Sequence, residues 1–491
     1  MNEKHSFPFS PELLAQTPPE VLAYFLDRLE QAEKIIAQLE ERLALTSKNS
    51  NLPPSSDSPG QKTKSKPKSE RKRGGQPGHK GHKRELLPPE QVDSIISVKP
   101  ENCRQCGLSF DAIQSSNPER HQVTELPVIR PIVTEYQLHH LTCPNCQTNN
   151  HAKKPKGVPE GMFGPRLMSM VALSSGSYQL SKRQITQLLR DFFGVTLSLG
   201  TVSRIEKRVS NALRHPVEEV ERFLPHQEVV HIDETGMKQE KKKGWMWTFV
   251  TKEVSLFRLS RSRGSEIPKE VLGEGFSGLG YTDRWGAYNW LAPTNRQFCW
   301  AHLIRDFERL KLRGKRDEKL ANRLLHCSKR LFKWLRKVRD GTLSIDKLEQ
   351  KVRPLRAEVL SHLREGKRCV QTKRKARTCR CEELNQSCLS QETAKFCRSL
   401  VKNEESLFAG LKNLELTNNA AERAIRQGVL YRKRSFGVDS GSGGKFLERV
   451  MTTVGTLRKQ ERNLMEFVFD AVGAFLSGEL GPSLLPLQQT P

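Results

Sequence analysis

The sequence has no run of about 18 apolar residues that would cross a membrane, and neither end carries a lipidation signal. The first residues, MNEKHSFPFSPELL, also lack the charged, apolar and small-residue order of a signal peptide. These absences predict a cytoplasmic protein without a membrane role. In a reducing compartment, the eleven cysteines are expected to be thiols or metal ligands rather than disulfides.

Acidic residues are scarce relative to basic ones. The chain has 55 Asp plus Glu against 82 Lys plus Arg, which gives a formal net charge of +27 and a pI near 9.8. Such a surface attracts phosphate polymers, so nucleic acid is the predicted partner and the cytoplasmic protein is expected to be nucleoid-associated. The 491 residues are enough for roughly three domains of about 100 to 200 residues each, including a catalytic core.

The N-terminal segment has apolar residues spaced alternately by three and four, as in a coiled-coil seam. They are Leu22, Phe25, Leu29, Ala32, Ile36, Leu39 and Leu43. This spacing predicts self-association; the alternative is an amphipathic helix that packs on its own chain. A linker rich in Ser, Pro and Asn follows. Residues 62–84 then carry ten basic side chains against one acid, Glu70, which favours contact with DNA phosphates.

Two C-x-x-C pairs, Cys103 with Cys106 and Cys143 with Cys146, come next. Four thiolates suit one tetrahedral, structural Zn²⁺. Residues 123–136 alternate like strands, and such strands would bring the two pairs together. A redox C-x-x-C pair and chance spacing are the alternatives.

Residues 180–211 predict a helix-turn-helix: a helical pattern over 181–193, then Gly194, then a second helix that opens near Ser198. Side chains early in the second helix are placed to reach base edges, and basic side chains to reach phosphates. The first group is Ser198, Thr201, Ser203 and Arg204, and the second is Lys182, Arg183 and Lys207. A plain helical hairpin is the alternative.

A pattern of strands places two carboxylates at strand ends. The expected strands are 228–233, 244–252, 254–261 and a fourth that ends near Asp283, with a helix over 266–272 before the fourth. This order matches the start of a ribonuclease-H-like sheet, in which the first and fourth strands are neighbours. Asp233 and Asp283 are therefore predicted to share one site that can hold a metal pair. Glu234 faces the other side of its strand and is expected at the rim.

A third carboxylate, Glu422, lies on the predicted first turn of a helix within LTNNAAERAIR. Its spacing from Asn419 is also that of a capping box. Spacing alone therefore leaves a metal ligand and a helix cap as equal alternatives.

Five stretches resemble those of DDE transposases of the TnpC type, the insertion-sequence-sixty-six family. They are HIDETG, YTDRWGAYNW, FCWAHLIRDF, LTNNAAERAIR and YRKRSFGVDSGSGG. The resemblance extends upstream through the helix, the linker, GGQPGHKGH and the paired C-x-x-C, and is weak only over residues 311–411. The resemblance implies that the protein cuts DNA at the ends of an insertion sequence and joins them to target DNA.

The same resemblance assigns the site. Asp233 and Asp283 become the catalytic aspartates and Glu422 the catalytic glutamate, and together they hold two Mg²⁺ (or Mn²⁺) ions. His302 and Arg305 match a family motif and are expected near the active site on DNA phosphate, although an isolated His is often structural. Arg426 is also expected to contact DNA. The implied partners are terminal inverted repeats, target DNA, further copies of the chain and accessory proteins of the same element.

The predicted fold class is a multidomain α/β protein with a ribonuclease-H-like catalytic core. The expected parts, in chain order, are a coiled-coil helix (1–48), a disordered basic linker (49–90), a zinc-binding domain (91–155), a helix-turn-helix (156–222), the first part of the catalytic domain (223–310), a helical insertion (311–411), the end of the catalytic domain with the Glu422 helix (412–440) and a C-terminal helical region (441–491). The insertion's cysteines, Cys369, Cys379, Cys381, Cys388 and Cys397, lack regular metal spacing and are expected to be incidental.

Two other functions fit parts of the sequence. A non-catalytic DNA-binding regulator would explain the charge but would leave the carboxylates without a role. A ribonuclease-H-like nuclease would share the metal chemistry, but it would cleave without joining.

Overall fold

The computed structural model describes residues 18–46, 49–50, 85–110, 118–368 and 389–486. The chain divides into two compact units, residues 58–132 and the remainder. The predicted basic stretch 62–84 lies outside the described residues. Of the five cysteines expected to be incidental, four also lie outside them, and Cys397 is described.

The smaller unit has little regular structure among its described residues: one short 3-10 helix, Pro89–Gln91, and an isolated bridge between Asn102 and Ser109. The strands predicted over 123–136 are wrong, since residues 118–139 form none. Their alternating apolar side chains are exposed, as at Val128 with 85%. Alternation produces a strand only where a partner strand supplies backbone hydrogen bonds, and residues 123–136, the last four of which belong to the larger unit, have no partner strand among the described residues.

The first described element of the larger unit is α2 (Pro19–Leu43), a single helix. Its predicted apolar seam is exposed, with Phe25 60%, Leu29 50% and Ile36 55% accessible. The C-terminal end of α2 is held by Glu41, whose Oε1 lies 2.7 Å from Arg309 Nε and 3.1 Å from Arg313 Nη2. The alternative of a helix that buries its apolar face on its own chain is therefore wrong for the described residues.

A five-stranded mixed sheet lies at the centre of this unit. Its strands are β3 (Val229–Gly236), β4 (Trp245–Val250), β5 (Ser255–Ser260), β6 (Leu279–Thr282) and β7 (Arg296–Phe298), in the order β5-β4-β3-β6-β7. The first three are antiparallel neighbours, whereas β3, β6 and β7 run parallel. The helix α7 (Glu266–Leu272) precedes β6. The predicted strand order and the predicted neighbours β3 and β6 are confirmed, and β7 was not predicted.

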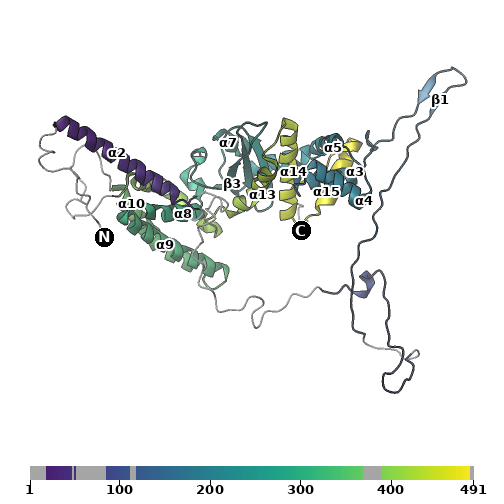
Figure 1. The fold of residues 1–491 in the computed structure, drawn as a ribbon, viewed down its shortest axis with the longest axis horizontal. Coiled ribbons are helices and arrows are strands. Elements are labelled where there is room, and N and C mark those ends of the chain that lie inside the picture. The colour runs from purple at the N-terminus through teal and green to yellow at the C-terminus, as the bar shows by residue number, and fades with distance from the viewer. Residues whose placement is uncertain (1–17, 47–48, 51–84, 111–117, 369–388, 487–491) are drawn as a thin grey trace. The chain divides into compact units, whose positions relative to one another are not determined.

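Helices cover both faces of the sheet. The face that carries Ile232, Phe249 and Leu256 belongs to the main apolar core. This core continues into α3 (Pro165–Gly176), α5 (Leu199–Ala212), α6 (Arg214–Phe223), α14 (Gly441–Lys459) and α15 (Leu464–Ser477). The other face packs Met246 and Phe257 against Leu447 and Met451 of α14. Figure 1 shows α13 (Asn419–Ser435) and α14 beside the sheet, with α3, α5 and α15 grouped beyond α14.

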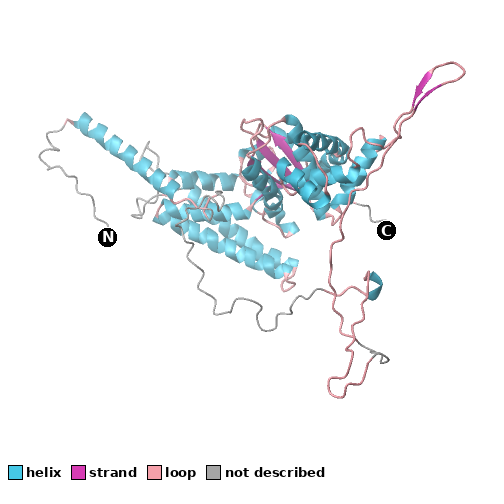
Figure 2. Ribbon diagram, turned by 45° about the vertical axis from the view of Figure 1, so that its right-hand side comes forward, coloured by secondary structure: helices cyan, strands magenta, loops and turns pink. Residues whose placement is uncertain are grey.

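The predicted insertion is helical in its described part and has its own core. It contains α9 (Lys315–Arg339), α10 (Ile345–Arg368) and α12 (Gln391–Lys402), which follow α8 (Trp300–Leu310). Leucines from these helices form a second apolar cluster with Trp300 and Phe307. In Figure 2 these helices form a group next to the strands.

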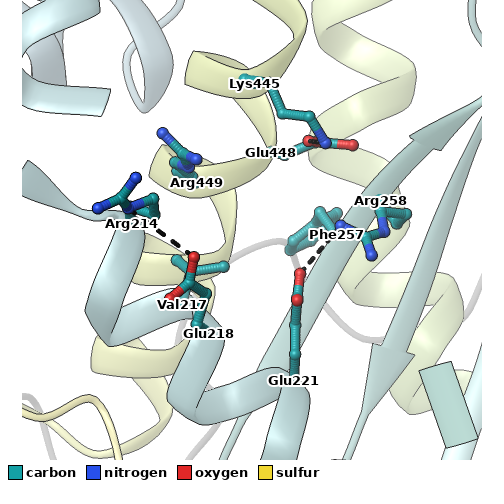
Figure 3. A pocket seen from close by; sticks show the side chains of 9 residues that line it. All are labelled: Arg214, Val217, Glu218, Glu221, Phe257, Arg258, Lys445, Glu448 and Arg449. Atoms are coloured by element: carbon teal, nitrogen blue, oxygen red, sulfur yellow. Dashed lines mark hydrogen bonds and ion pairs between the residues drawn. The ribbon is translucent and has the colours of Figure 1, made fainter. Parts of the chain in front are cut away.

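A cavity of about 200 Å³ between α6, β5 and α14 is lined mainly by charged side chains. Figure 3 shows that they pair with one another: Arg258 with Glu221 at 3.0 Å, and Arg214 with Glu218 at 3.8 Å. Glu448 pairs with Lys445 at 3.0 Å and accepts a backbone hydrogen bond from Leu259. These charges are already paired with one another. The ion pairs therefore hold the surrounding elements together and leave little unpaired charge for a ligand.

Within the described ranges, no helix combines the length and the apolar character that crossing a membrane requires.

The contact between α3 and α14 provides a stability test. A Cβ added at Gly176 would lie 3.0 Å from Cβ of Val450, a rigid β-branched side chain, and closer still to its Cγ1. We expect Gly176→Ala to lower the free energy of unfolding by roughly 1–3 kcal/mol through overpacking, as measured by denaturant titration.

The matched control is Gly473→Ala, also within a helix, where an added Cβ meets no atom within 4 Å. That change should be neutral or stabilise by about 0.5–1 kcal/mol. Equal stability of the two variants would contradict the close packing of α3 on α14.

Candidate functional site

Asp233 lies on β3 and shares a face of the sheet with the helix α13. Asp233 pairs with Thr248 of β4, and Thr248 pairs with Phe257 of β5, so the three residues lie on the same face. Phe257 belongs to the apolar cluster against which side chains of α13 pack. Neighbouring residues of a strand alternate between faces, so Glu234 points to the other side, opposite Trp247. The prediction that Asp233 and Glu234 face opposite sides of the sheet is confirmed.

Asp283 directly follows β6, the parallel neighbour of β3. Its Oδ1 accepts a hydrogen bond from Trp285 N at 2.8 Å. The buried guanidinium of Arg296 on β7 donates to the carbonyl of Asp283 at 2.9 Å and to Thr282 Oγ1 at 2.9 Å. These bonds fix the turn after β6 and so hold the carboxylate at the end of the strand.

Glu422 lies on the first turn of α13. The helix begins without a side-chain cap hydrogen bond, so the capping-box interpretation of Glu422 is wrong. Its Oε1 instead lies 3.5 Å from Arg305 Nη2, 3.4 Å from His302 Nδ1 and 3.9 Å from Cys299 Sγ. The structure thus brings His302 and Arg305, both predicted near the site, to the third carboxylate.

The charges of Asp283 and Glu422 both reach Asp233. The pKa of Asp233 is raised well above 3.8, first by burial and then by the charges of Glu234, Asp283 and Glu422. Burial also raises the pKa of Asp283. Their oxygens do not all lie within 4.8 Å of one another, as judged over the described residues. The oxygen donors of Asp233 and Asp283, both with raised pKa values, together with the carboxylate of Glu422 form a set suited to hard divalent cations such as Mg²⁺ or Mn²⁺.

Asn418 ties the start of α13 to β3. Its Nδ2 donates to the carbonyl of Ile232 at 2.7 Å, and its Oδ1 lies 3.1 Å from Nδ1 of His231. Its backbone N donates to Cys299 Sγ at 3.1 Å, and its carbonyl accepts from Glu422 N at 3.1 Å. The fully buried Asn418 therefore fixes the position of Glu422 relative to the strand that carries Asp233.

Glu234 is buried rather than at the rim, which corrects the prediction. Its side chain is 2% exposed and pairs with Arg263 at 2.7 Å, and Tyr288 Oη donates to its second oxygen. The Arg263 guanidinium stacks over Trp245 and Trp285, with its centre 4.6 and 4.0 Å from the ring centroids. Burial, then the charge of Asp283, raises the pKa of Glu234 to about 7.

His302 is neutral in this surrounding. Burial, followed by the charges of Arg305 and Arg284, lowers its pKa to about 3. Its contact with Glu422 is therefore no ion pair, and Arg305 supplies the positive charge that balances the glutamate. Arg284 is itself paired with Asp306 of α8 at 2.7 Å, which links the turn after β6 to the helix of His302.

The helices predicted for the helix-turn-helix are present as α4 (Lys182–Phe193) and α5. Gly194 takes a left-handed conformation with φ 64° and ends α4, and Ser198 caps α5 by accepting from Thr201 N. Among the predicted DNA contacts, Arg183, Ser198 and Arg204 are exposed and Thr201 is half-buried. Lys182 is engaged within the fold, 3.1 Å from Glu206.

Both C-x-x-C loops adopt the same turn, one in each unit. Cys103 N donates to the carbonyl five residues ahead, and its own carbonyl accepts from the amide four residues ahead, each at 2.9 Å. Cys143 makes the same pair of hydrogen bonds, each at 2.9 Å, and its loop joins β1 (His140–Thr142) to β2 (Asn149–His151). Hydrogen bonds within these turns lower the pKa values of Cys103 and Cys146.

Sequence reasoning missed several residues of the carboxylate site, namely Asn418, Cys299, Arg263, Tyr288 and Arg296. Asn418 and Cys299 lie within stretches already quoted for the family resemblance, but no local pattern marks their contacts. Arg426, predicted to touch DNA, is exposed on α13 one turn beyond Glu422.

Comparison with known proteins shows the class of protein to which the chain belongs. Residues 160–446 match the model described as Transposase IS66 family, a range that includes Asp233, Asp283 and Glu422. The class is thus that of the transposases, and the chain belongs to the IS66 family. Membership implies a role in DNA transposition, DNA binding and the use of a divalent metal. Residues 12–85 match a second model, a Family of unknown function (DUF6444).

Two proteins of Sinorhizobium fredii (strain NBRC 101917 / NGR234) are similar to most of the chain. The uncharacterized protein y4hP is 24% identical over 403 residues, 74% of this chain and 69% of that protein. The uncharacterized protein y4qI is 25% identical over 399 residues, 75% of this chain and 69% of its own length.

The repulsion at the site predicts a pH dependence of stability. The folded pKa of Glu234, about 7, lies above its ordinary value of 4.5. The stability that this group contributes is therefore full below about pH 4.5 and is lost as pH rises through about 7, roughly 3 kcal/mol for this shift. The raised pKa of Asp233 acts in the same direction. In chelator, we expect the free energy of unfolding to fall from about pH 5 to about pH 8.

Asp233→Asn should remove one repelling charge and raise the free energy of unfolding at pH 8 by roughly 0.5–2 kcal/mol in chelator. Mg²⁺ should stabilise the wild type and have little effect on the variant, as measured by thermal unfolding. The control is Asp470→Asn, a change at an exposed carboxylate of α15. If the stability of Asp233→Asn depended on pH and Mg²⁺ as strongly as that of the wild type, the proposed repulsion would be contradicted.

Proposed function

We propose that the protein is the catalytic transposase of an insertion sequence, which cleaves DNA at the element's ends and joins the freed 3′-hydroxyls to target DNA. The observation that carries the proposal is the convergence of Asp233, Asp283 and Glu422 from β3, the end of β6 and α13. Family membership supports it. In this proposal the mixed sheet is the core of a ribonuclease-H-like catalytic domain.

The three carboxylates are the proposed ligands of two Mg²⁺ or Mn²⁺ ions. Such ions supply an activated nucleophile and neutralise charge on the attacking and departing oxygens of the phosphodiester. The chain's own contribution is to hold the carboxylates in place: Arg296 fixes the turn of Asp283, and Asn418 fixes the start of the Glu422 helix. Neutral His302 and cationic Arg305 pack against Glu422 and orient its carboxylate.

DNA is proposed to reach the site along exposed basic side chains. Arg426 lies one turn beyond Glu422 on α13, close enough for contact with a phosphate of the bound strand. Arg183 and Arg204, exposed on α4 and α5, are proposed to read the terminal repeats as part of a helix-turn-helix. Lys182 is proposed to contribute less to DNA binding, because its ammonium group already pairs with Glu206.

One structural Zn²⁺ is proposed on Cys103, Cys106, Cys143 and Cys146. The identical turns of the two C-x-x-C loops support this assignment, because each turn presents two thiols from a hairpin-like loop. Hydrogen bonds that lower a thiol pKa favour the thiolate that binds metal.

The catalytic assignment is tested with full-length protein, Mg²⁺ and labelled DNA that carries the inverted repeats flanking its gene. Asp233→Asn and Glu422→Gln should bind this DNA as the wild type does and lose cleavage by about 100-fold or more, because they remove groups that stabilise transition-state charge. The control is Glu274→Gln, whose side chain is 80% exposed. Cleavage retained in both site variants would refute the triad, and binding without cleavage in the wild type would favour a regulator.

The exposed seam of α2 is proposed to join two copies of the chain, because pairing two element ends requires at least two protomers. Its apolar residues have coiled-coil spacing and are uncovered in one chain. Leu29→Lys combined with Ile36→Lys should shift the protein to smaller species in analytical ultracentrifugation without changing its thermal unfolding.

The control, Gln31→Lys combined with Glu33→Gln, adds the same charge at positions outside the seam and should leave the assembly unchanged. If the seam variant sedimented as the wild type does, α2 would have another role.

A further inference from the structure

Three side chains with different metal-binding atoms meet between two helices of the insertion. Cys327 comes from α9, whereas Glu358 and His362 are one turn apart on α10. A sulfur, an oxygen and a nitrogen of these residues all lie within 4.8 Å of one another. The carboxylate triad lies on other elements, so these residues are not part of the proposed catalytic site.

We propose that Cys327, Glu358 and His362 bind a Zn²⁺ ion that holds α9 against α10. Zinc accepts this mixture of sulfur, nitrogen and oxygen donors in tetrahedral geometry. A thiolate and a carboxylate supply two negative charges and so match the charge of the ion. On binding, the Cys327 thiol gives its proton to the solvent as the bond between zinc and sulfur forms.

The geometry is close to that of a bound state. Zinc bonds of about 2.0–2.3 Å require ligand atoms within about 3.3–3.8 Å of one another in a tetrahedron. Cys327 Sγ and Glu358 Oε1 already meet this requirement at 3.4 Å. Since no two of the three ligand atoms are more than 4.8 Å apart, the remaining contraction is at most about 1 to 1.5 Å. Rotation about the side-chain bonds of the half-buried His362 can supply it. Water can complete the shell from the exposed side.

Two ion pairs between the same helices flank the cluster. Arg330 holds Oε2 of Glu358 at 2.6 Å and leaves Oε1 directed at the thiol. Arg323 donates to both carboxylate oxygens of Glu365, at 3.0 and 3.2 Å. An outer partner that orients a ligating carboxylate in this way is a regular feature of metal sites.

Cys397 provides a comparison within the same insertion. It is as buried as Cys327, and burial raises the pKa of both thiols to about 12. Yet Cys397 belongs to no cluster of three metal-binding side chains among the described residues. A buried cysteine of this insertion therefore need not have an imidazole and a carboxylate beside it, as Cys327 has.

The test compares full-length wild type with Cys327→Ala, His362→Gln and the control Cys397→Ala, each stripped with chelator and reloaded with Zn²⁺ or Co²⁺ without DNA. Wild type and control should retain one metal equivalent more than the two site variants. Loss of a direct ligand should weaken Zn²⁺ binding by more than the about 10- to 100-fold typical of outer partners. In Co²⁺ protein, Cys327→Ala should remove the charge-transfer absorption of a single thiolate.

His362→Gln keeps the test decisive if Cys327→Ala fails to fold, since His362 is half-buried at the edge of the helix pair. Cys103→Ser with Cys143→Ser removes the other proposed zinc site and should leave the insertion's equivalent in place. Equal metal content in wild type, His362→Gln and Cys397→Ala would overturn the proposal. The proposal is independent of DNA cleavage, so its failure and that of the catalytic assignment are distinguishable.

Discussion

The burial of Asp233 among other carboxylates is the constraint that the surrounding elements must meet. Burial and the neighbouring charges raise the pKa of Asp233, so the folded chain is under electrostatic strain unless protons or cations are bound. Asn418 opposes this strain by bonding β3 and α13 together, and Arg305 balances the charge of Glu422. Such a site costs stability in the absence of a ligand, as expected where function requires charges to be held close together.

Much of the sheet could be predicted because the patterns that indicate its strands lie within short stretches of the sequence. The apolar runs ending at Asp233 and near Asp283, with two strands and a helix between them, predicted β3 to β6 in order and the pairing of β3 with β6. Alternation along a strand also separated Asp233 from Glu234. The contacts of Asn418 could not be predicted, because its partners Ile232 and Cys299 lie more than 100 residues away in the chain.

The wrong predictions share one cause, a local pattern whose effect depends on distant partners. Residues 123–136 alternate like a strand but have no partner strand in the described structure. Glu234 directly follows the predicted strand 228–233 and was therefore expected at the rim, yet it lies within β3, where Arg263 and Tyr288 bind its buried side chain. Glu422 has the spacing of a helix cap, but its carboxylate contacts Arg305 and His302, and no side-chain cap hydrogen bond forms at the start of its helix.

Strand transfer is the most direct measure of the central claim, that the three carboxylates form one active centre for both cutting and joining. The measurement follows a pre-cleaved, labelled element end with a free 3′-hydroxyl, incubated with target plasmid, Mg²⁺ and full-length protein, wild type or Asp283→Asn. The account predicts covalent joining of the label to the plasmid by the wild type and none by the variant. Joining by Asp283→Asn at the wild-type rate would contradict it.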